Sequence, residues 1–289
     1  MKRLLILSGK GGTGKTTVCA ALIRLTQARA VADCDVDAPN LHLVTKQSAV
    51  PEFHDFIGGD KSSIDPHKCV GCGECERLCR FDAICLKNGK AVVNEYACEG
   101  CGVCEFVCPS DAVTLTPDVA GTRELYLDEN VFSTATLKMG RGTSGKLVAD
   151  VKLAMFKAAP ECELAIVDGS PGIGCPVIAS FSGMDLVLVV TEPSGSGISD
   201  LQRLVKTGQI FGTKMAVCVN MWDVSPAHTE QIRQYCEEQD IPFVGKIPFD
   251  PKAVEAVNEG KTVVDIPCPA GDAIREICAA VLALLEIDN

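Results

Sequence analysis

The chain has 289 residues, of which 47% are hydrophobic and 22% charged, and its formal net charge at pH 7 is −11. This length exceeds that of one usual hydrophobic core, so we expect one large domain and a smaller unit, and the apolar content excludes wholesale disorder. The acidic balance argues against nucleic acid and against an anionic membrane surface as partners, because both are bound through a surplus of Lys and Arg.

Seventeen cysteines are present, and eight of them fall into two tight clusters. That grouping suits metal ligation in a reducing compartment better than a disulfide framework. The scattered remainder are expected to be small core residues. No stretch reaches the ~18 apolar residues that a membrane span needs, and Leu4–Leu7 is too short for the core of a secretion signal. We therefore expect a cytoplasmic protein.

The first segment has the pattern of an α/β fold. Residues 4–7 form a short apolar run that predicts a buried parallel strand. A glycine-rich loop follows, and apolar residues at helical spacing then predict a helix over 15–29. A second short strand over 30–32 ends at Asp33. This order of strand, loop, helix and strand is typical of α/β proteins.

The cysteine-rich segment contains an internal repeat. The run from Cys69 to Cys79 matches the run from Cys98 to Cys108 at an offset of 29 residues. The match continues beyond the cysteines and aligns Cys85 with Thr114. Cys85 is therefore not expected to be a metal ligand.

Strand and helix patterns alternate after the repeat. Strands are predicted at 164–167, 186–190, 215–219 and 243–247, and helices at 146–158, 199–211, 227–239, 251–259 and 271–287. Such alternation predicts a mostly parallel sheet covered on both faces. We expect residues 1–57 and 118–289 to form this α/β domain and residues 58–117 to be an insertion in it.

Residues 9–16, Gly-Lys-Gly-Gly-Thr-Gly-Lys-Thr, fit the P-loop pattern G-x-x-x-x-G-K-[ST] between a strand and a helix. The glycines let backbone N–H groups close on a phosphate, and the helix N-terminus adds partial positive charge. Lys15 would contact the β- and γ-phosphates, and the Thr16 hydroxyl would bind Mg²⁺. The alternative is a glycine-rich turn that binds no nucleotide.

The spacing C-x₂-C-x₂-C-x₃-C, present twice, is the bacterial two-cluster ferredoxin pattern, in which the fourth cysteine crosses to the other [4Fe–4S] cluster. The predicted sets are Cys69, Cys72, Cys75 and Cys108, and Cys98, Cys101, Cys104 and Cys79. Pro109 follows its cysteine as the pattern expects, whereas Arg80 replaces the other proline. Zinc is the competing occupant, but structural zinc usually takes two separated pairs of ligands.

Lys10, directly after the first glycine, resembles the deviant Walker A motif of the MinD superfamily, which includes the nitrogenase iron protein and the Mrp-like cluster carriers. With the cysteine segment, the chain resembles the members of this superfamily that contain an inserted two-cluster ferredoxin domain. In the family this lysine reaches across a dimer interface to the nucleotide of the partner. The resemblance therefore implies a dimer, either a homodimer or a heterodimer with a paralogue.

Other stretches also resemble the family. Residues 33–41 look like switch I, where the resemblance gives Asp35 the role of positioning the attacking water, with Asp37 as the second candidate and a helix cap as the structural alternative. Residues 166–172 resemble Walker B and switch II, so Asp168 would hold Mg²⁺ through water and Gly172 would approach the γ-phosphate.

The resemblance places Asn220 and Pro248 against adenine, although Asn220 also suits a turn. The implied nucleotide contacts are Gly11, Gly12, Thr13, Gly14, Lys15, Thr16, Thr17, Asp168, Gly172, Asn220 and Pro248, and the implied catalytic residues are Lys10, Lys15 and Asp35. Cys175 has the spacing of a cysteine that bridges a cluster between subunits of the nitrogenase iron protein, or it is a packed cysteine near switch II.

The resemblance implies an ATPase, converting ATP and water to ADP and phosphate, that is slow without its partner. Its cofactors would be ATP, Mg²⁺ and two [4Fe–4S] clusters. The expected function is to couple the nucleotide state to electron transfer, or to iron–sulfur or metallocofactor assembly, on a partner protein. The alternative is a nucleotide-gated scaffold or positioning ATPase in which the clusters are mainly structural.

Overall fold

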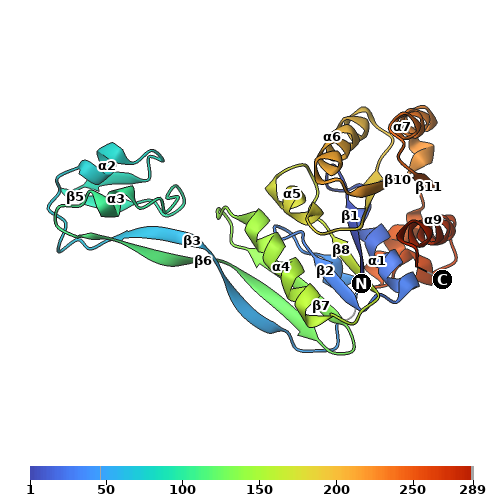
Figure 1. Cartoon of the computed structure of the whole chain (residues 1–289), viewed down its shortest axis with the longest axis horizontal. Helices are drawn as coiled ribbons and strands as arrows, with labels where there is room; N and C mark the ends of the chain where they lie inside the picture. The colour runs from blue at the N-terminus through green and yellow to red at the C-terminus, as the bar shows by residue number, and fades with distance from the viewer. Residues whose placement is uncertain (46, 288–289) are drawn as a thin grey trace. The chain divides into compact units, whose positions relative to one another are not determined.

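A computed structural model describes residues 1–45 and 47–287. The chain divides into two compact units, which Figure 1 shows in ribbon form. The larger, here called the P-loop unit, comprises 1–53, 123–136 and 144–289, and its last two residues lie outside the described part. The smaller, here called the cysteine unit, comprises 54–122 and 137–143.

A nine-stranded sheet has the order β11-β10-β9-β1-β8-β2-β7-β6-β3. Its strands are β1 (Lys2–Leu7), β2 (Ala30–Asp33), β3 (Glu52–Ile64), β6 (Val113–Leu127), β7 (Val131–Leu137), β8 (Leu164–Asp168), β9 (Leu186–Thr191), β10 (Lys214–Asn220) and β11 (Phe243–Ile247). From β11 to β7 all pairs are parallel, and Leu5 of β1 lies opposite Val167 and Val187 on its two neighbours. The predicted α/β class with a mostly parallel sheet is confirmed.

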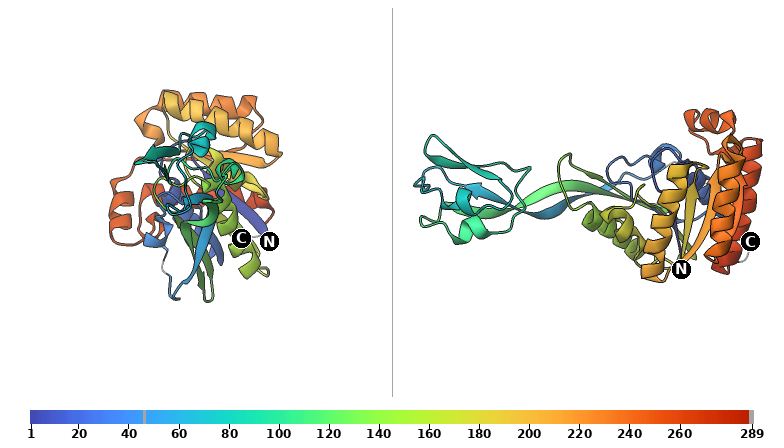
Figure 2. Two further views of the ribbon diagram at one scale, coloured as in Figure 1. Left: turned by 90° about the vertical axis from the view of Figure 1, so that its left-hand side faces the viewer. Right: turned by 90° about the horizontal axis from the view of Figure 1, so that it is seen from above.

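Helices cover both faces of the parallel part of this sheet, as Figure 2 shows. They are α1 (Lys15–Thr26), α4 (Ser144–Ala158), α5 (Cys175–Phe181), α6 (Gly195–Phe211), α7 (Pro226–Glu238), α8 (Pro251–Asn258) and α9 (Pro269–Leu285). α1 and α9 share a buried apolar cluster with one face, and α4 to α7 contact the strands from the other. Because both faces are covered, Leu4–Leu7 is almost fully buried, which explains its continuous apolar run.

Helix ends differ from the predicted ones for local reasons. α1 stops at Thr26 rather than at residue 29, because Gln27 adopts a left-handed conformation with φ 51°. α6 begins four residues before the predicted start, since the Ser194 side chain accepts the Gly197 N–H at 3.0 Å and caps a first turn that is rich in glycine. α5 was not predicted.

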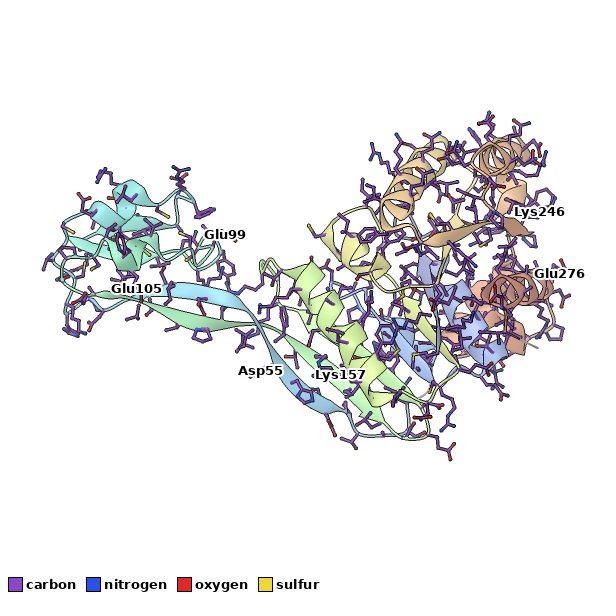
Figure 3. All side chains as sticks on the ribbon, viewed as in Figure 1. Asp55, Glu99, Glu105, Lys157, Lys246 and Glu276 are labelled. Carbon is purple, nitrogen blue, oxygen red and sulfur yellow. The ribbon has the colours of Figure 1, made fainter. Side chains whose placement is uncertain are left out.

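The cysteine unit contains two short helices, α2 (Glu74–Leu78) and α3 (Val103–Phe106), and a separate hairpin of β4 (Ile84–Lys87) and β5 (Lys90–Val93). The sequence repeat recurs in its hydrogen bonds. Oε1 of Glu76 accepts the Leu86 N–H at 3.0 Å, and Oε1 of Glu105, labelled in Figure 3, accepts the Leu115 N–H at 3.1 Å. Its small buried cluster consists largely of the cysteines themselves and of short apolar side chains around them.

The boundaries of the cysteine unit differ from the predicted 58–117. β3 and β6 run through both predicted boundaries, so the unit extends from His54 to Thr122. It also takes in the loop 137–143, because Arg141 forms ion pairs with Glu95 at 2.6 Å and with Asp118 at 3.0 Å. Among the described residues, no helix has the length and apolar character required to cross a membrane.

Candidate functional site

The loop between β1 and α1 is shaped for close approach of an anion. Gly12 and Gly14 have φ of 81° and 85°, a region that favours glycine, and the Ser8 hydroxyl donates to the carbonyl of Lys10 at 2.9 Å. No described atom lies within 4 Å of a Cβ built on Gly11 or Gly12, so open space borders the loop. The Thr13 hydroxyl is buried without a partner among the described residues. The loop therefore offers polar groups to a ligand.

Lys15 and Asp168 form a buried ion pair at the base of this loop. Lys15 Nζ lies 2.5 Å from Asp168 Oδ1, and the Thr16 hydroxyl donates to Asp168 Oδ2 at 2.8 Å. Burial alone would lower the pKa of Lys15, but the Asp168 carboxylate more than offsets it and the pKa is raised. The structure thus brings together Lys15, Thr16 and Asp168, the three residues predicted to contact phosphate and Mg²⁺.

Asp33, at the end of β2, organises the predicted switch I segment. Its fully buried carboxylate accepts the backbone N–H groups of Asp35, Asn40 and Leu41 at 3.1, 3.0 and 2.9 Å. Burial first, and then the charge of Asp168, raise the pKa of Asp33 to about 7. Sequence reasoning gave Asp33 no role of its own; its place at a strand end, before a loop rich in acids, was the available signal.

The two predicted switch segments lie beside each other. Asp33 and Asp168 are paired in register at the ends of β2 and β8, and the Ser170 hydroxyl donates to the carbonyl of Cys34 at 2.5 Å. Asp35 is partly buried, which raises its pKa, whereas Asp37 is exposed. Gly172, with φ 102°, donates its N–H to the carbonyl of Ser8 at 2.9 Å and so closes switch II onto the phosphate loop.

Asn220 also contacts the phosphate loop. Its Nδ2 donates to the carbonyl of Thr13 at 2.8 Å, and it would lie 2.3 Å from a Cβ on Gly14, so glycine is required there by both space and φ. Ile247, the last residue of β11, pairs with Asn220, and Pro248 follows it. Asn220 and Pro248 thus lie at the carboxyl ends of adjacent strands, where open α/β sheets bind ligands.

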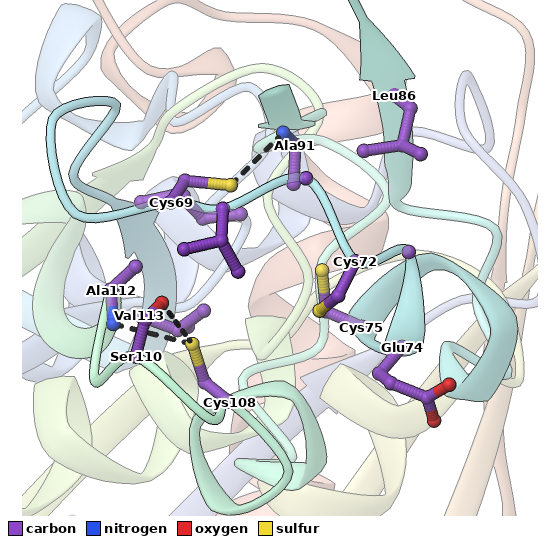
Figure 4. A pocket seen from close by; sticks show the side chains of 14 residues that line it. Cys69, Cys72, Glu74, Cys75, Leu86, Ala91, Cys108, Ser110, Ala112 and Val113 are labelled. Atoms are coloured by element: carbon purple, nitrogen blue, oxygen red, sulfur yellow. Dashed lines mark hydrogen bonds between the residues drawn. The ribbon is translucent and has the colours of Figure 1, made fainter. Parts of the chain in front are cut away.

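A first small cavity lies in the cysteine unit, where the side chains of four cysteines point into one space (Figure 4). They are Cys69, Cys72, Cys75 and Cys108. The empty volume is about 340 Å³, with the open solvent at its mouth included. Ala91 donates its N–H to the Cys69 sulfur at 3.5 Å, and Ala112 donates to the Cys108 sulfur at 3.2 Å.

A second cavity, of about 300 Å³ measured in the same way, is lined by the other four cysteines. They are Cys79, Cys98, Cys101 and Cys104. The Cys98 sulfur accepts N–H groups from Ser62 and Gly100 at 3.5 and 3.4 Å, and Ala83 donates to the Cys79 sulfur at 3.4 Å. The two cavities group the cysteines as the ferredoxin-type spacing does, with the fourth member of each run crossing to the other set.

Hydrogen-bond donors around the two sets favour the thiolate form of several cysteines. Within the described part of the chain, no three His, Cys, Asp or Glu side chains are arranged as a site for a single metal ion. Burial would raise the pKa of Cys98 and of Cys108, but hydrogen bonds from backbone N–H groups outweigh it and lower both. Thiolates, which these donors favour, are the form that binds metal.

Sequence comparison identifies the fold of the P-loop unit. The family pattern described as the CobQ/CobB/MinD/ParA nucleotide binding domain matches residues 4–263. The chain belongs to this family. The uncharacterized protein MJ0578 of Methanocaldococcus jannaschii is 35% identical over 227 residues, which cover 75% of this chain and 77% of that protein. An iron–sulfur cluster carrier protein of the same organism is 21% identical over 98% of this chain and 85% of its own length.

Solved structures agree with this assignment at the level of the fold. The septum site-determining protein MinD of Pyrococcus horikoshii, in complex with Mg-ADP, superposes with a TM-score of 0.59 at 18% identity, over 97% of this chain and 95% of that chain. The chain is thus a member of a family of nucleotide binding domains, and the matched residues include the loop between β1 and α1.

Lys10, the lysine that resembles the MinD-type signature, has partners within its own chain. Its Nζ lies 2.6 Å from Glu192 Oε1 and donates to the Ser196 hydroxyl at 3.1 Å. Burial raises the pKa of Glu192, but hydrogen bonds from Lys10 and Ser194 outweigh it and the pKa is lowered. The sequence alone did not predict this contact, because the two residues are far apart in the chain.

Cys85 and Cys175 are two further exposed cysteines. Within residues 1–45 and 47–287, neither Cys85 nor Cys175 lines a four-cysteine cavity. Cys85 is exposed on β4, and Cys175 is exposed at the first position of α5, directly after switch II.

Proposed function

We propose that this protein hydrolyses ATP and that its nucleotide state controls electron transfer, or iron–sulfur or metallocofactor assembly, on a partner protein. One observation carries the proposal: a nucleotide-binding domain of the MinD/ParA family and two four-cysteine cavities occur in a single chain. The similarity to an iron–sulfur cluster carrier protein of Methanocaldococcus jannaschii supports it. The Mg-ADP complex of the MinD protein supports the nucleotide class.

The phosphate loop would bind and orient the triphosphate. N–H groups of residues 11–16 would donate to phosphate oxygens, aided by the amino terminus of α1. Lys15 would contact the β- and γ-phosphates, and Thr16 and Asp168, which already share a hydrogen bond, would hold Mg²⁺. The ion would neutralise charge that develops on the phosphates. Asp35, held by Asp33, would orient the attacking water.

The adenine would lie between Asn220 and Pro248, at the ends of neighbouring strands.

Lys10 would leave Glu192 and reach the nucleotide of a second subunit, so ATP would favour a dimer. Closure and hydrolysis would then move switch I and switch II together, since Ser170 links the second to the first. The second subunit would be either a copy of this chain or a paralogue.

In the cysteine unit, the eight lining cysteines would hold two [4Fe–4S] clusters, four thiolates to each. The donor set fits this group: all ligands are sulfur, backbone N–H groups point at several of them, and the fourth cysteine of each run crosses to the other cavity. The clusters would supply one-electron storage. The fold around each cluster would determine how far it is exposed to solvent. Cys72 is the exposed cysteine of the first set, and Cys101 is the exposed cysteine of the second.

The test compares wild type with Lys15→Ala and with Lys157→Ala, an exposed lysine on α4 that serves as the matched control. Each protein is purified without oxygen, its iron and sulfide are measured, and reduction of the clusters by dithionite is followed with and without Mg-ATP. We expect ATP to change the rate in wild type and in Lys157→Ala and to have no effect in Lys15→Ala. Equal rates in all three would overturn the coupling and favour a scaffold with structural clusters.

A further inference from the structure

The sequence repeat extends further toward the N-terminus than the cysteines themselves. The end of β3 takes the place in one half that β5 takes in the other, so that Lys61 and Ser62 correspond to Lys90 and Ala91. In each half the lysine Nζ donates to the carbonyl of the first cysteine, Cys98 or Cys69. In each half the next residue donates its N–H to the sulfur of that same cysteine at 3.5 Å.

The two halves differ at one position within this shared frame. Ser62 is 9% exposed, and its hydroxyl lies 3.0 Å from the Cys104 sulfur and 3.7 Å from the Cys98 sulfur. Ala91, its counterpart, has only a methyl group. When Cys104 ligates a metal as a thiolate it carries no proton, so the Ser62 hydroxyl is the donor in this contact. A hydrogen bond to a charged acceptor is about twice as strong as a neutral one.

The first site has donors of its own, but its hydroxyl contact is longer. In the first cavity the Ser110 hydroxyl lies 3.7 Å from the Cys108 sulfur, which makes it a weaker contact than that of Ser62. Its counterpart in the repeat is Phe81, which lines the second cavity. Backbone N–H groups point at sulfurs of both sets, from Ala91, Ser110, Ala112 and Val113 at the first and from Ser62, Gly100 and Ala83 at the second. The short contact of the buried Ser62 hydroxyl is therefore the feature that distinguishes the second site.

Reduction adds one electron, taken from an external reductant such as dithionite, and breaks no bond. Donors aimed at the ligand sulfurs stabilise the more negative, reduced form, and burial strengthens them. We propose that the site of Cys98, Cys101, Cys104 and Cys79 has the higher reduction potential of the two, and that Ser62 sets the difference. In a chain that holds one electron, that electron therefore resides at this second site. The inference rests on the proposed function in that both sites hold [4Fe–4S] clusters.

The experiment is an anaerobic redox titration of the full chain, read by electron paramagnetic resonance. Variants are Ser62→Ala, the reciprocal Ala91→Ser, and Ser63→Ala, which removes an exposed hydroxyl on the same strand as a control. Wild type should show two one-electron steps. In Ser62→Ala the potential of the upper step should fall by about 59 mV. For one electron this equals a tenfold decrease in the ratio of reduced to oxidised cluster at a given potential. Ala91→Ser should raise the lower step, and Ser63→Ala should move neither.

Iron and sulfide are measured on every sample, so that a loss of the clusters is distinguished from a change in their reduction potentials. About eight iron atoms per chain with an unshifted upper step in Ser62→Ala would overturn this inference and leave the proposed function standing. An equal shift of both steps would also overturn it, since Ser62 would then act on the unit as a whole. Chains that hold no clusters in wild type would overturn the proposed function and this inference with it.

Discussion

At the scale of single residues, buried charge is concentrated where the predicted switches meet the phosphate loop. Lys15, Asp33 and Asp168 are all buried, and each has specific hydrogen-bond partners within the chain. Such groups cost several kcal/mol to desolvate, so they are retained only where hydrogen bonds and opposite charges offset that cost. Their arrangement fixes the backbone of the two loops that would enclose the γ-phosphate.

Replacement of Asp33 tests this arrangement. In Asp33→Ala the N–H groups of Asn40 and Leu41 lose their acceptor, and the buried, unpaired donor of Leu41 costs about 1–3 kcal/mol. We expect hydrogen exchange at these two amides to accelerate at least tenfold, and the ATPase rate to fall because Asp35 is no longer held. For the hydrogen-exchange measurement the control is Asp37→Ala, at an exposed carboxylate on the same loop. Unchanged protection of both amides would contradict the role given to Asp33.

Sequence spacing is informative for side chains that local chain geometry brings together. The P-loop and the cysteine runs are of this kind, since their proposed ligand-binding groups come from one turn or a few turns. Contacts between distant segments were missed, because they depend on the packing of the whole sheet. Glu192 with Lys10 and Asp33 with Leu41 are examples: nothing in either local pattern names the partner.

At the scale of elements, one lysine connects two helices of the P-loop unit. Lys152 of α4 is 4% exposed, and its Nζ donates to the carbonyls of Ala179, Ser180 and Ser182 at 3.0, 2.7 and 2.7 Å. These carbonyls lie at the end of α5, where helix carbonyls have no partner within the helix. Lys152 therefore fixes the helix that directly follows switch II.

Lys152→Met should lower the free energy of unfolding by about 2–4 kcal/mol, because the α5 carbonyls lose their donor while the packing volume is kept. Lys157→Met, on the exposed face of the same helix, should change it by less than about 0.5 kcal/mol. Urea unfolding measures both. Equal stability of the two variants would show that water replaces the ammonium group and that α5 is held by its apolar contacts instead.

The strands and helices that sequence patterns missed share one property, which is the lack of a clear hydrophobic pattern. Strands β1, β8, β9 and β10 are buried on both faces, so their apolar runs are continuous and easily recognised. β3 is mostly exposed and contains two adjacent glycines, and buried and exposed residues do not alternate regularly along it. α5 follows a segment rich in Gly, Ser and Pro that predicts only a loop.

At the scale of the whole molecule, the two units differ in how they are stabilised. The P-loop unit has an extensive apolar core, whereas the cluster in the cysteine unit consists of seven buried residues, three of them proposed ligands. Small units with so little core usually need metal or cross-links to fold. We therefore expect the proposed clusters to contribute folding free energy to one unit and not to the other.

Removal of iron tests this difference. Treatment with a chelator and an oxidant should make residues 54–122 sensitive to protease, while nucleotide binding by the P-loop unit persists with its affinity changed less than about threefold. Limited proteolysis and nucleotide titration on the same sample provide both measurements. Resistance of the iron-free cysteine unit to protease would mean that its apolar cluster suffices.

Assembly is expected to depend on the ion pair between Lys10 and Glu192. Glu192→Gln weakens the hold on Lys10 within its own chain, and a partly exposed pair of this kind contributes at most about 1 kcal/mol. We expect ATP-dependent dimerisation to tighten by up to about fivefold in Glu192→Gln and to be lost in Lys10→Ala, as measured by sedimentation. Weaker dimerisation of Glu192→Gln would show instead that Glu192 belongs to the interface.

The exchange of the fourth cysteine between the two runs makes the cysteine unit indivisible. Cys108 completes the set begun by Cys69, and Cys79 completes the set begun by Cys98. A chain truncated to either run alone would retain four cysteines but no complete set. Although the repeat has the form of a tandem duplication, neither copy is a self-sufficient module, so loss of one run by deletion would remove ligands from both sites at once.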